Sequence, residues 1–101
     1  MKSAEAIEDE FRQKALLRGR ALLFQPADAI RLIRRCREAK LRILGIDGFL
    51  LTETRTQPCI EHSVDFSSSA LNALGDDNWE RAEEFLRVRE ASGLLFEVTI
   101  E

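Results

Sequence analysis

The chain has one histidine, His62, and it lies close in sequence to residues of the types that form catalytic triads. Cys59 or Ser63 would be the nucleophile, and Asp65 or Asp47 would orient the imidazole. Apolar and polar residues alternate from Cys59 onwards, which predicts a strand whose successive side chains point to opposite faces. His62 would then face away from Cys59, Ser63 and Asp65. We therefore predict a histidine in the core or at its rim, and a protein that is not an enzyme.

No spacing typical of a cofactor or metal site occurs in the sequence. Cys36 and Cys59 are far apart and form no CxxC pair, so we expect both to be reduced and neither to bind zinc. Gly45 and Gly48 lack the third glycine and the strand-to-helix setting of a dinucleotide fingerprint. We predict no cofactor and no metal.

Charge is divided unevenly along the chain, whose formal net charge is −3. Residues 1–40 carry ten lysines and arginines against six acids, whereas residues 41–101 carry five against twelve. Net negative charge argues against nucleic-acid binding, because phosphate contacts need a concentrated basic face. Two interpretations stay open: two solvated surfaces of opposite sign, or an acidic face that binds a basic partner.

Length and composition indicate one globular domain, 1–101. The chain is 45% hydrophobic and 33% charged, which lies outside the range of disordered proteins. No stretch approaches the ~20 apolar residues of a membrane span, and acids from Glu5 onward argue against a secretory signal. We expect a cytoplasmic protein without membrane association.

The stretch LRILGIDGFLLTE, residues 41–53, is predicted to organise the fold. Asp47-Gly48 between apolar runs is the strongest short-range signal for a two-residue hairpin turn. Such a turn would create three cross-strand pairs: Ile46 with Phe49, Leu44 with Leu51, and Arg42 with Glu53. In the alternative, the stretch is one long strand kinked at Gly45 or Gly48.

Helices are predicted at three places. Ser3 caps the first, which Gly19 ends, and Pro26 begins the second at residues 26–39. The third, residues 78–91, follows a capping box formed by Asp77 and Glu80.

Further strands are predicted at residues 21–24, 59–66 and 94–101. The expected fold is α+β, a mostly antiparallel sheet of four to five strands with helices packed on one face. If residues 41–54 form one strand, the order becomes a ferredoxin-like βαββαβ preceded by a helix.

An acidic surface is the predicted interaction site. Its members are six residues of the second half of the chain: Asp76, Asp77, Trp79, Glu80, Glu61 and Asp65. Trp79 would anchor the partner if it is exposed, and otherwise belongs to the core. We predict a protein-interaction module for a basic protein partner. The alternative is a small-ligand-binding regulatory domain with its site near Gly45 and Gly48. A homodimer that forms through a sheet edge is a further alternative for the assembly.

Several short motifs resemble those of small uncharacterised bacterial proteins, some of which are similar to immunity proteins of toxin systems. The motifs are Ile43-Leu44-Gly45-Ile46-Asp47-Gly48-Phe49, Gln57-Pro58, Asp65-Phe66-Ser67 and Leu95-Phe96-Glu97-Val98, within residues 26–101. Immunity proteins are commonly acidic blockers of basic nuclease toxins, so the resemblance implies an inhibitor of a basic toxin. It assigns no functional residue.

Overall fold

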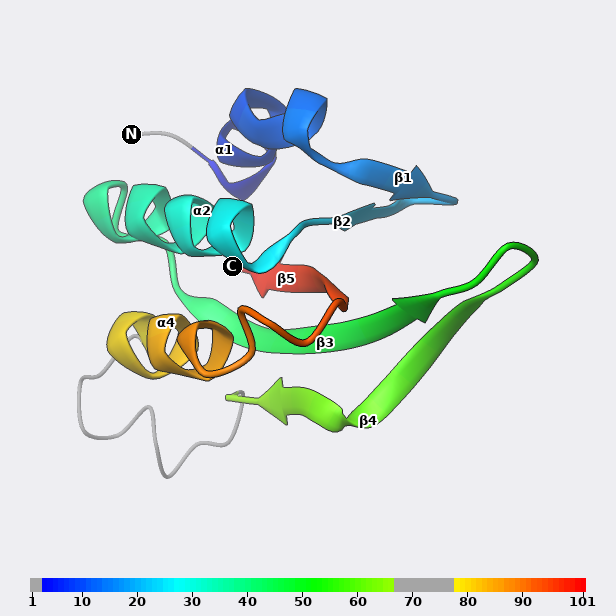
Figure 1. Ribbon diagram of the computed structural model, residues 1–101. Coiled ribbons are helices and arrows are strands. Elements are labelled where there is room, and N and C mark those ends of the chain that lie inside the picture. The colour runs from blue at the N-terminus through cyan, green and yellow to red at the C-terminus, as the bar shows by residue number, and fades with distance from the viewer. Residues whose placement is uncertain (1–2, 67–77) are drawn as a thin grey trace.

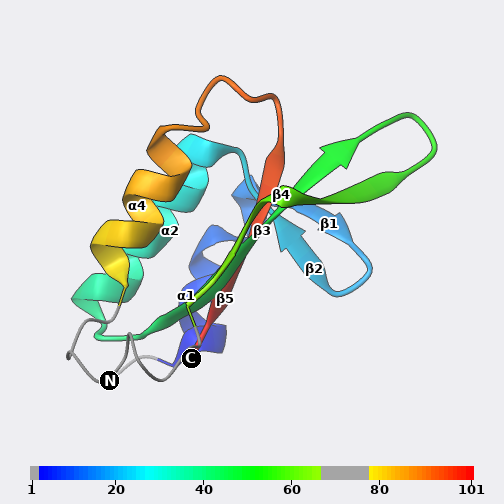
Figure 2. The same cartoon turned by 90° about the horizontal axis from the view of Figure 1, so that it is seen from below.

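The computed structural model of the protein describes residues 3–66 and 78–101, which form an α+β fold as predicted. In chain order the elements are α1 (Ala4–Phe11), the 3₁₀ turn η1 (Arg12–Lys14), β1 (Leu16–Arg18), β2 (Ala21–Leu23), α2 (Pro26–Glu38), β3 (Ile43–Leu51), β4 (Thr56–Asp65), α4 (Trp79–Arg87) and β5 (Leu95–Ile100). The helices pack against the sheet, with α2 and α4 side by side in both views (Figures 1 and 2).

All strand pairs are antiparallel. β3 is the centre of a three-stranded sheet, β4-β3-β5, and β1 pairs with β2 in a two-stranded sheet. The sheets meet where the backbones of Phe24 and Phe96 exchange two hydrogen bonds of 2.8 Å. The strands therefore follow one another as β4-β3-β5-β2-β1. The element order βαββαβ is present, but β2 lies outside β5 and not at the centre of the sheet, which distinguishes this fold from the ferredoxin-like one.

The predicted hairpin turn at Asp47-Gly48 is wrong, and the alternative of one long strand is correct. β3 passes straight through both residues because it pairs with β4 on one side and with β5 on the other. Pairing on two sides outweighs the local turn preference. The chain reverses after β3, where the Thr52 amide donates to the Arg55 carbonyl at 2.8 Å. Arg42, expected to face Glu53, instead forms a 3.1 Å ion pair with Glu101.

The N-terminal helix is shorter than predicted. Ser3 does cap it, since its hydroxyl accepts from the Ala6 amide at 3.2 Å. The helix ends at Phe11, and Leu16–Arg18 then pairs with β2. Gly19, predicted as the helix stop, has φ +59° in the turn between these strands, a conformation that glycine adopts at little cost.

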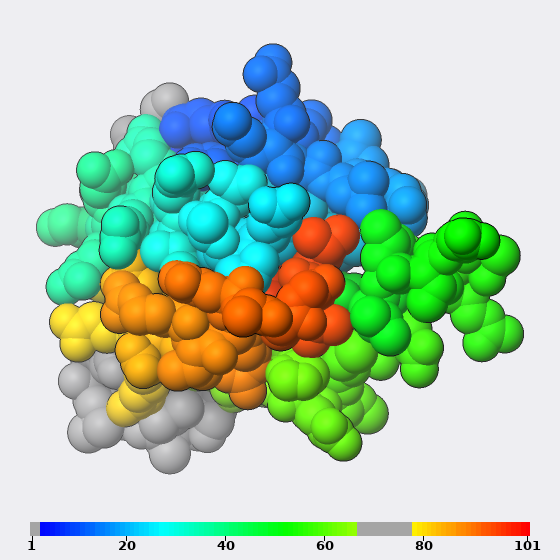
Figure 3. All heavy atoms as spheres, in the orientation of Figure 1, coloured from blue at the N-terminus to red at the C-terminus, as the bar shows by residue number. Residues whose placement is uncertain are grey.

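The core lies between the helices and the sheet. Helix α2 buries Ala29, Ile30, Ile33 and Cys36, which recur at helical spacing, and Phe24 and Phe96 are among the largest fully buried side chains. Both hairpins, β1–β2 and β3–β4, point away from the helices, and the end of β3–β4 projects from the body (Figures 2 and 3). Among the described residues, no helix has the length and apolar character needed to cross a bilayer.

Candidate functional site

The register between β3 and β4 shifts in the middle of β4. Gly48 pairs with Cys59 and Ile46 pairs with Val64, so Asp47 alone faces residues 60–63 of β4. The extra residues leave the ladder of backbone hydrogen bonds, as in a large β-bulge. Bulges of this kind re-aim side chains and are over-represented beside functional sites.

Gly48 and Ser63 hold the bulge against β3. A Cβ atom at Gly48 would lie 2.6 Å from the His62 carbonyl oxygen, so only glycine lets the two backbones approach this closely. The Ser63 hydroxyl accepts a hydrogen bond from the Gly48 amide at 3.2 Å and donates to the Cys59 carbonyl at 2.9 Å. The Ser63 hydroxyl therefore provides the hydrogen bonds that a regular strand would provide to these two backbone groups.

Arg89 fixes the other side of the bulge. Its Nε donates to His62 Nδ1 at 3.2 Å, its Nη1 donates to the Phe85 carbonyl at 3.0 Å, and its guanidinium lies 3.8 Å from the centroid of the Phe85 ring. His62 is half-buried, which agrees with its predicted place at the rim of the core. Two of the residues considered for a triad therefore have other partners. His62 accepts a hydrogen bond from Arg89, and Ser63 bonds to backbone groups.

The bulge exposes Ile60 and frames a hollow. The alternation from Cys59 onwards predicts that Ile60 lies on the same face as His62 and Val64, but Ile60 is 88% exposed because the bulge breaks this alternation. Beside it lies a hollow of about 470 Å³, which we call the bulge hollow. Its polar lining comes from Asp47, Ser63, Asp65 and Thr99, and its apolar lining from Leu44, Ile60 and Val64.

The open side of the sheet is negatively charged at this point. Asp47 lies directly opposite Glu97 of β5, and Asp47 makes no ion pair within the described residues. Burial raises the pKa of Glu97, and the nearby Asp47 and Glu8 carboxylates raise it further. The residues that line the bulge hollow include two aspartates and no lysine or arginine.

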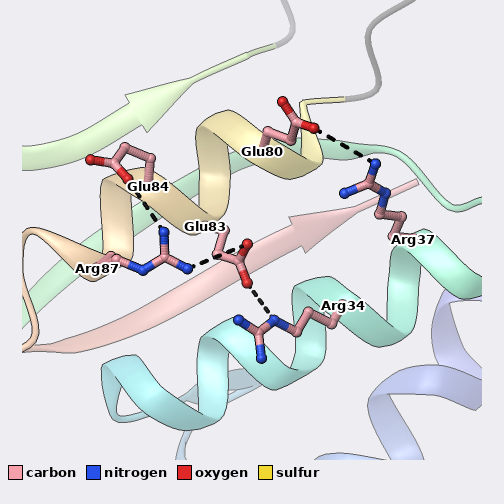
Figure 4. A network of polar contacts seen from close by, with 6 residues as sticks. All are labelled: Arg34, Arg37, Glu80, Glu83, Glu84 and Arg87. Atoms are coloured by element: carbon pink, nitrogen blue, oxygen red, sulfur yellow. Dashed lines mark hydrogen bonds and ion pairs between the residues drawn. The ribbon is translucent and has the colours of Figure 1, made fainter.

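The acids of α4, by contrast, are matched by arginines within the molecule. Glu83 binds Arg34 of α2 and also Arg87 at 3.6 Å (Figure 4). Glu80, predicted as a partner-binding residue, forms a 3.7 Å ion pair with Arg37. The basic face of α2 thus meets the acidic face of α4, and the ion pairs Arg34–Glu83 and Arg37–Glu80 link the two helices.

Trp79 is a packing residue at the start of α4. It is half-buried, its Nε1 donates to the Leu41 carbonyl at 2.7 Å, and the Arg37 guanidinium lies 5.7 Å from its ring centroid. The next residue of the predicted site along the chain, Glu80, is paired as described above. Asp76 and Asp77 lie outside the described residues.

Glu61 and Asp65 are the predicted site residues that the structure places at the bulge. Both are exposed on β4, and Asp65 lines the bulge hollow. Ile60 and Gly48 join Asp47 and Ser63 at the bulge only through the strand pairing, which the sequence does not predict. One local signal was available, because Pro58 within a strand indicates an edge strand or a bulge.

The two cysteines are free thiols, as expected. Cys36 is buried in the core, and burial raises its pKa to about 12. In the described part of the chain, no group of three or more histidine, cysteine and acidic side chains is arranged to hold a metal ion. Compared with known protein families, curated proteins and solved structures, the chain shows no match. The resemblance to immunity proteins stays a prediction.

Proposed function

We propose that the protein is an interaction module that binds a basic protein through the open side of the sheet at the bulge of β4. The observation that carries this proposal is Ile60, a large apolar side chain that is 88% exposed. A single exposed hydrophobic residue is ordinary on a protein surface. Ile60 differs because Gly48 and Ser63 hold its segment in place, so little conformational entropy is lost when a partner covers it.

Charge supports a basic partner. Asp47, Asp65 and Glu97 lie on or beside the bulge hollow, and Glu61 follows Ile60 directly. Complementary charge speeds diffusional encounter and makes the association rate depend on salt. These acids support an acidic surface on the sheet, whereas Glu80 and Glu83 of α4 form ion pairs with arginines of α2. An immunity-type inhibitor of a basic toxin would be one protein of this kind.

Side chains, and not strand addition, are proposed to make the interface. β4 is an edge strand among the described residues, but Pro58 lacks an amide hydrogen and the bulge interrupts the ladder. Both features hinder pairing with a further strand. A second copy of the chain would also place like charges together, which disfavours a homodimer at this surface.

Affinity capture from an extract of the native cells tests the proposal. Wild type is compared with Ile60→Asp and with Val88→Asp, which changes a side chain that is also exposed, by 66%, at the end of α4. We expect a basic protein to be retained by wild type and by Val88→Asp and lost by Ile60→Asp. Equal capture of that protein by the Ile60 variant would contradict the proposal.

A small-ligand-binding regulatory domain is the second candidate. It is favoured by the size of the bulge hollow, about 470 Å³, which falls in the range of ligand pockets, and by its position beside Gly45. A ligand bound there would raise the melting temperature, and the rise would grow with the logarithm of the ligand's excess over its dissociation constant. A thermal-shift screen of neutral metabolites checks this alternative, because a basic protein partner predicts no such hits.

A further inference from the structure

We infer that the bulge hollow receives one arginine or lysine side chain of the partner, with its aliphatic stem along Ile60 and Val64 and its cationic group at Asp47. The inference rests on the proposed function and adds the chemical class of the residue recognised. It concerns a hollow that the fold builds from three strands, β3, β4 and β5.

The two kinds of lining match the two parts of a basic side chain. Leu44, Ile60 and Val64 offer apolar surface, and the Asp47 carboxylate lies on the same hollow. Long basic side chains lie with their methylene groups along apolar surface while the charged end stays near water or a counter-charge. A purely apolar side chain would leave Asp47 desolvated without a partner, which is costly.

The local charge favours a cation over other occupants. Asp47 faces Glu97 across β3 and β5, and like charges directly opposite each other are unfavourable. Burial raises the pKa of Glu97, and the Asp47 and Glu8 charges raise it further. A bound cation would relieve this repulsion, whereas an anionic side chain would add to it.

An NMR titration of the ¹⁵N-labelled full chain tests the inference with defined probes. The first is the capped peptide Gly-Val-Arg-Val-Gly, and its matched control carries citrulline, a neutral side chain of nearly the same shape, in place of arginine. We expect the arginine peptide to shift the amides of Asp47, Ser63 and Thr99 and the citrulline peptide to leave them unchanged. Asp47→Asn should weaken binding about tenfold, the loss expected for one charge-assisted contact.

The control variant is Glu80→Gln, which removes an acid of α4 and should leave the dissociation constant unchanged. Equal shifts with the citrulline peptide, equal affinity in Asp47→Asn, or no shifts at millimolar arginine peptide would each overturn the inference. Shifts of the same amides that depend on protein concentration without peptide would overturn it in favour of a second copy.

The two proposals fail separately. If Ile60→Asp abolishes capture of the basic protein but the arginine probe does not bind, the interaction module stands and the arginine site falls. If the arginine probe binds and Ile60→Asp still captures the protein, the hollow is a cation-binding site and the proposed interface is wrong.

Discussion

Asp47 in β3 lies directly opposite Glu97 in β5, so two carboxylates share one cross-strand position at the centre of the sheet. The chain tolerates this pair although like charges at such positions reduce stability. Glu97 is half-buried, and its pKa is raised by burial and by the Asp47 charge.

Glu97→Gln should therefore stabilise the protein at neutral pH. A carboxyl group whose pKa is raised in the folded state stabilises the fold below its ordinary value of 4.5 and loses that contribution as pH rises through the raised pKa. The variant does not titrate, so its unfolding free energy should exceed that of wild type by roughly 0.2 to 1 kcal/mol at pH 7. Urea denaturation at a series of pH values measures this difference.

The gain should disappear in acid, where Glu97 is protonated in wild type. Glu8, whose own pKa is also raised, mainly by burial, is present in both proteins, and its charge adds to the repulsion that the variant removes. Asp47→Asn should give a comparable gain, and the double variant should not add the two. A gain that persists unchanged at pH 3 would show that charge repulsion is not its cause.

Gly48→Ala should disturb the bulge. The new methyl group would lie 2.6 Å from the His62 carbonyl oxygen and 3.0 Å from His62 Cβ, so β4 has to move away. We expect a loss of about 1–3 kcal/mol in unfolding free energy, the usual cost of overpacking.

Gly19→Ala is the matched control, because a Cβ atom there meets nothing within 4 Å and the variant suffers only from the positive φ. Its cost should be about 1 kcal/mol. Hydrogen exchange adds a local readout: Gly48→Ala should increase exchange in residues 59–64 and Gly19→Ala should not. Equal stability losses without a local effect would mean that the close approach at Gly48 is unimportant.

Ser63→Ala should release the same bulge by another route. The hydroxyl satisfies the Gly48 amide and the Cys59 carbonyl in a partly buried place, and alanine leaves both without that partner. The expected cost is about 1–3 kcal/mol. Thr52 offers a close comparison, since its hydroxyl also accepts from one amide and donates to one carbonyl, both of Arg55, but at an exposed turn.

Water replaces the partners lost in Thr52→Ala, so that variant should lose less than about 0.5 kcal/mol. Chemical denaturation of both variants measures the difference. A Ser63→Ala protein as stable as Thr52→Ala would indicate that water reaches the bulge and that its hydrogen bonds do not hold it.

Local signals explain the parts of the fold that the sequence predicts well. Helix α2 begins at Pro26 and buries residues spaced by three and four, as its pattern requires. The last strand alternates regularly, as its sequence predicts, and pairs with β3. Asp47-Gly48 predicts the wrong structure because this dipeptide is typical of a turn. Pairing with residues 56–65 and 95–100, which are distant in the sequence, keeps it extended.

The candidate site could not be predicted because it depends on register. Ile60, His62 and Val64 alternate evenly in the sequence, and only the pairing of Gly48 with Cys59 reveals that extra residues must leave the ladder. The charge pattern has the same difficulty. Composition shows how many acids and arginines the chain has, but not that Arg34 meets Glu83, 49 positions away.

Glu83→Gln should destabilise the protein more than Glu80→Gln. The Glu83 side chain is 21% exposed and contacts two arginines, Arg34 and Arg87, whereas that of Glu80 is 82% exposed and contacts Arg37 at 3.7 Å. We expect a loss of about 1 kcal/mol for Glu83→Gln and less than about 0.5 kcal/mol for Glu80→Gln, because exposed pairs are weak. Urea denaturation at low ionic strength measures both values.

Salt separates the electrostatic part of this difference from packing. At 1 M NaCl the screening length is about 3 Å, so the cost of Glu83→Gln should fall while any packing loss remains. The same two variants also locate the acidic interface. If the acids of α4 serve the α2–α4 contact, neither variant should weaken binding of a basic partner, whereas Asp47→Asn should. Weaker partner binding by Glu80→Gln would extend the interface to α4, as in the predicted site, which combined Glu80 with Glu61 and Asp65 of β4.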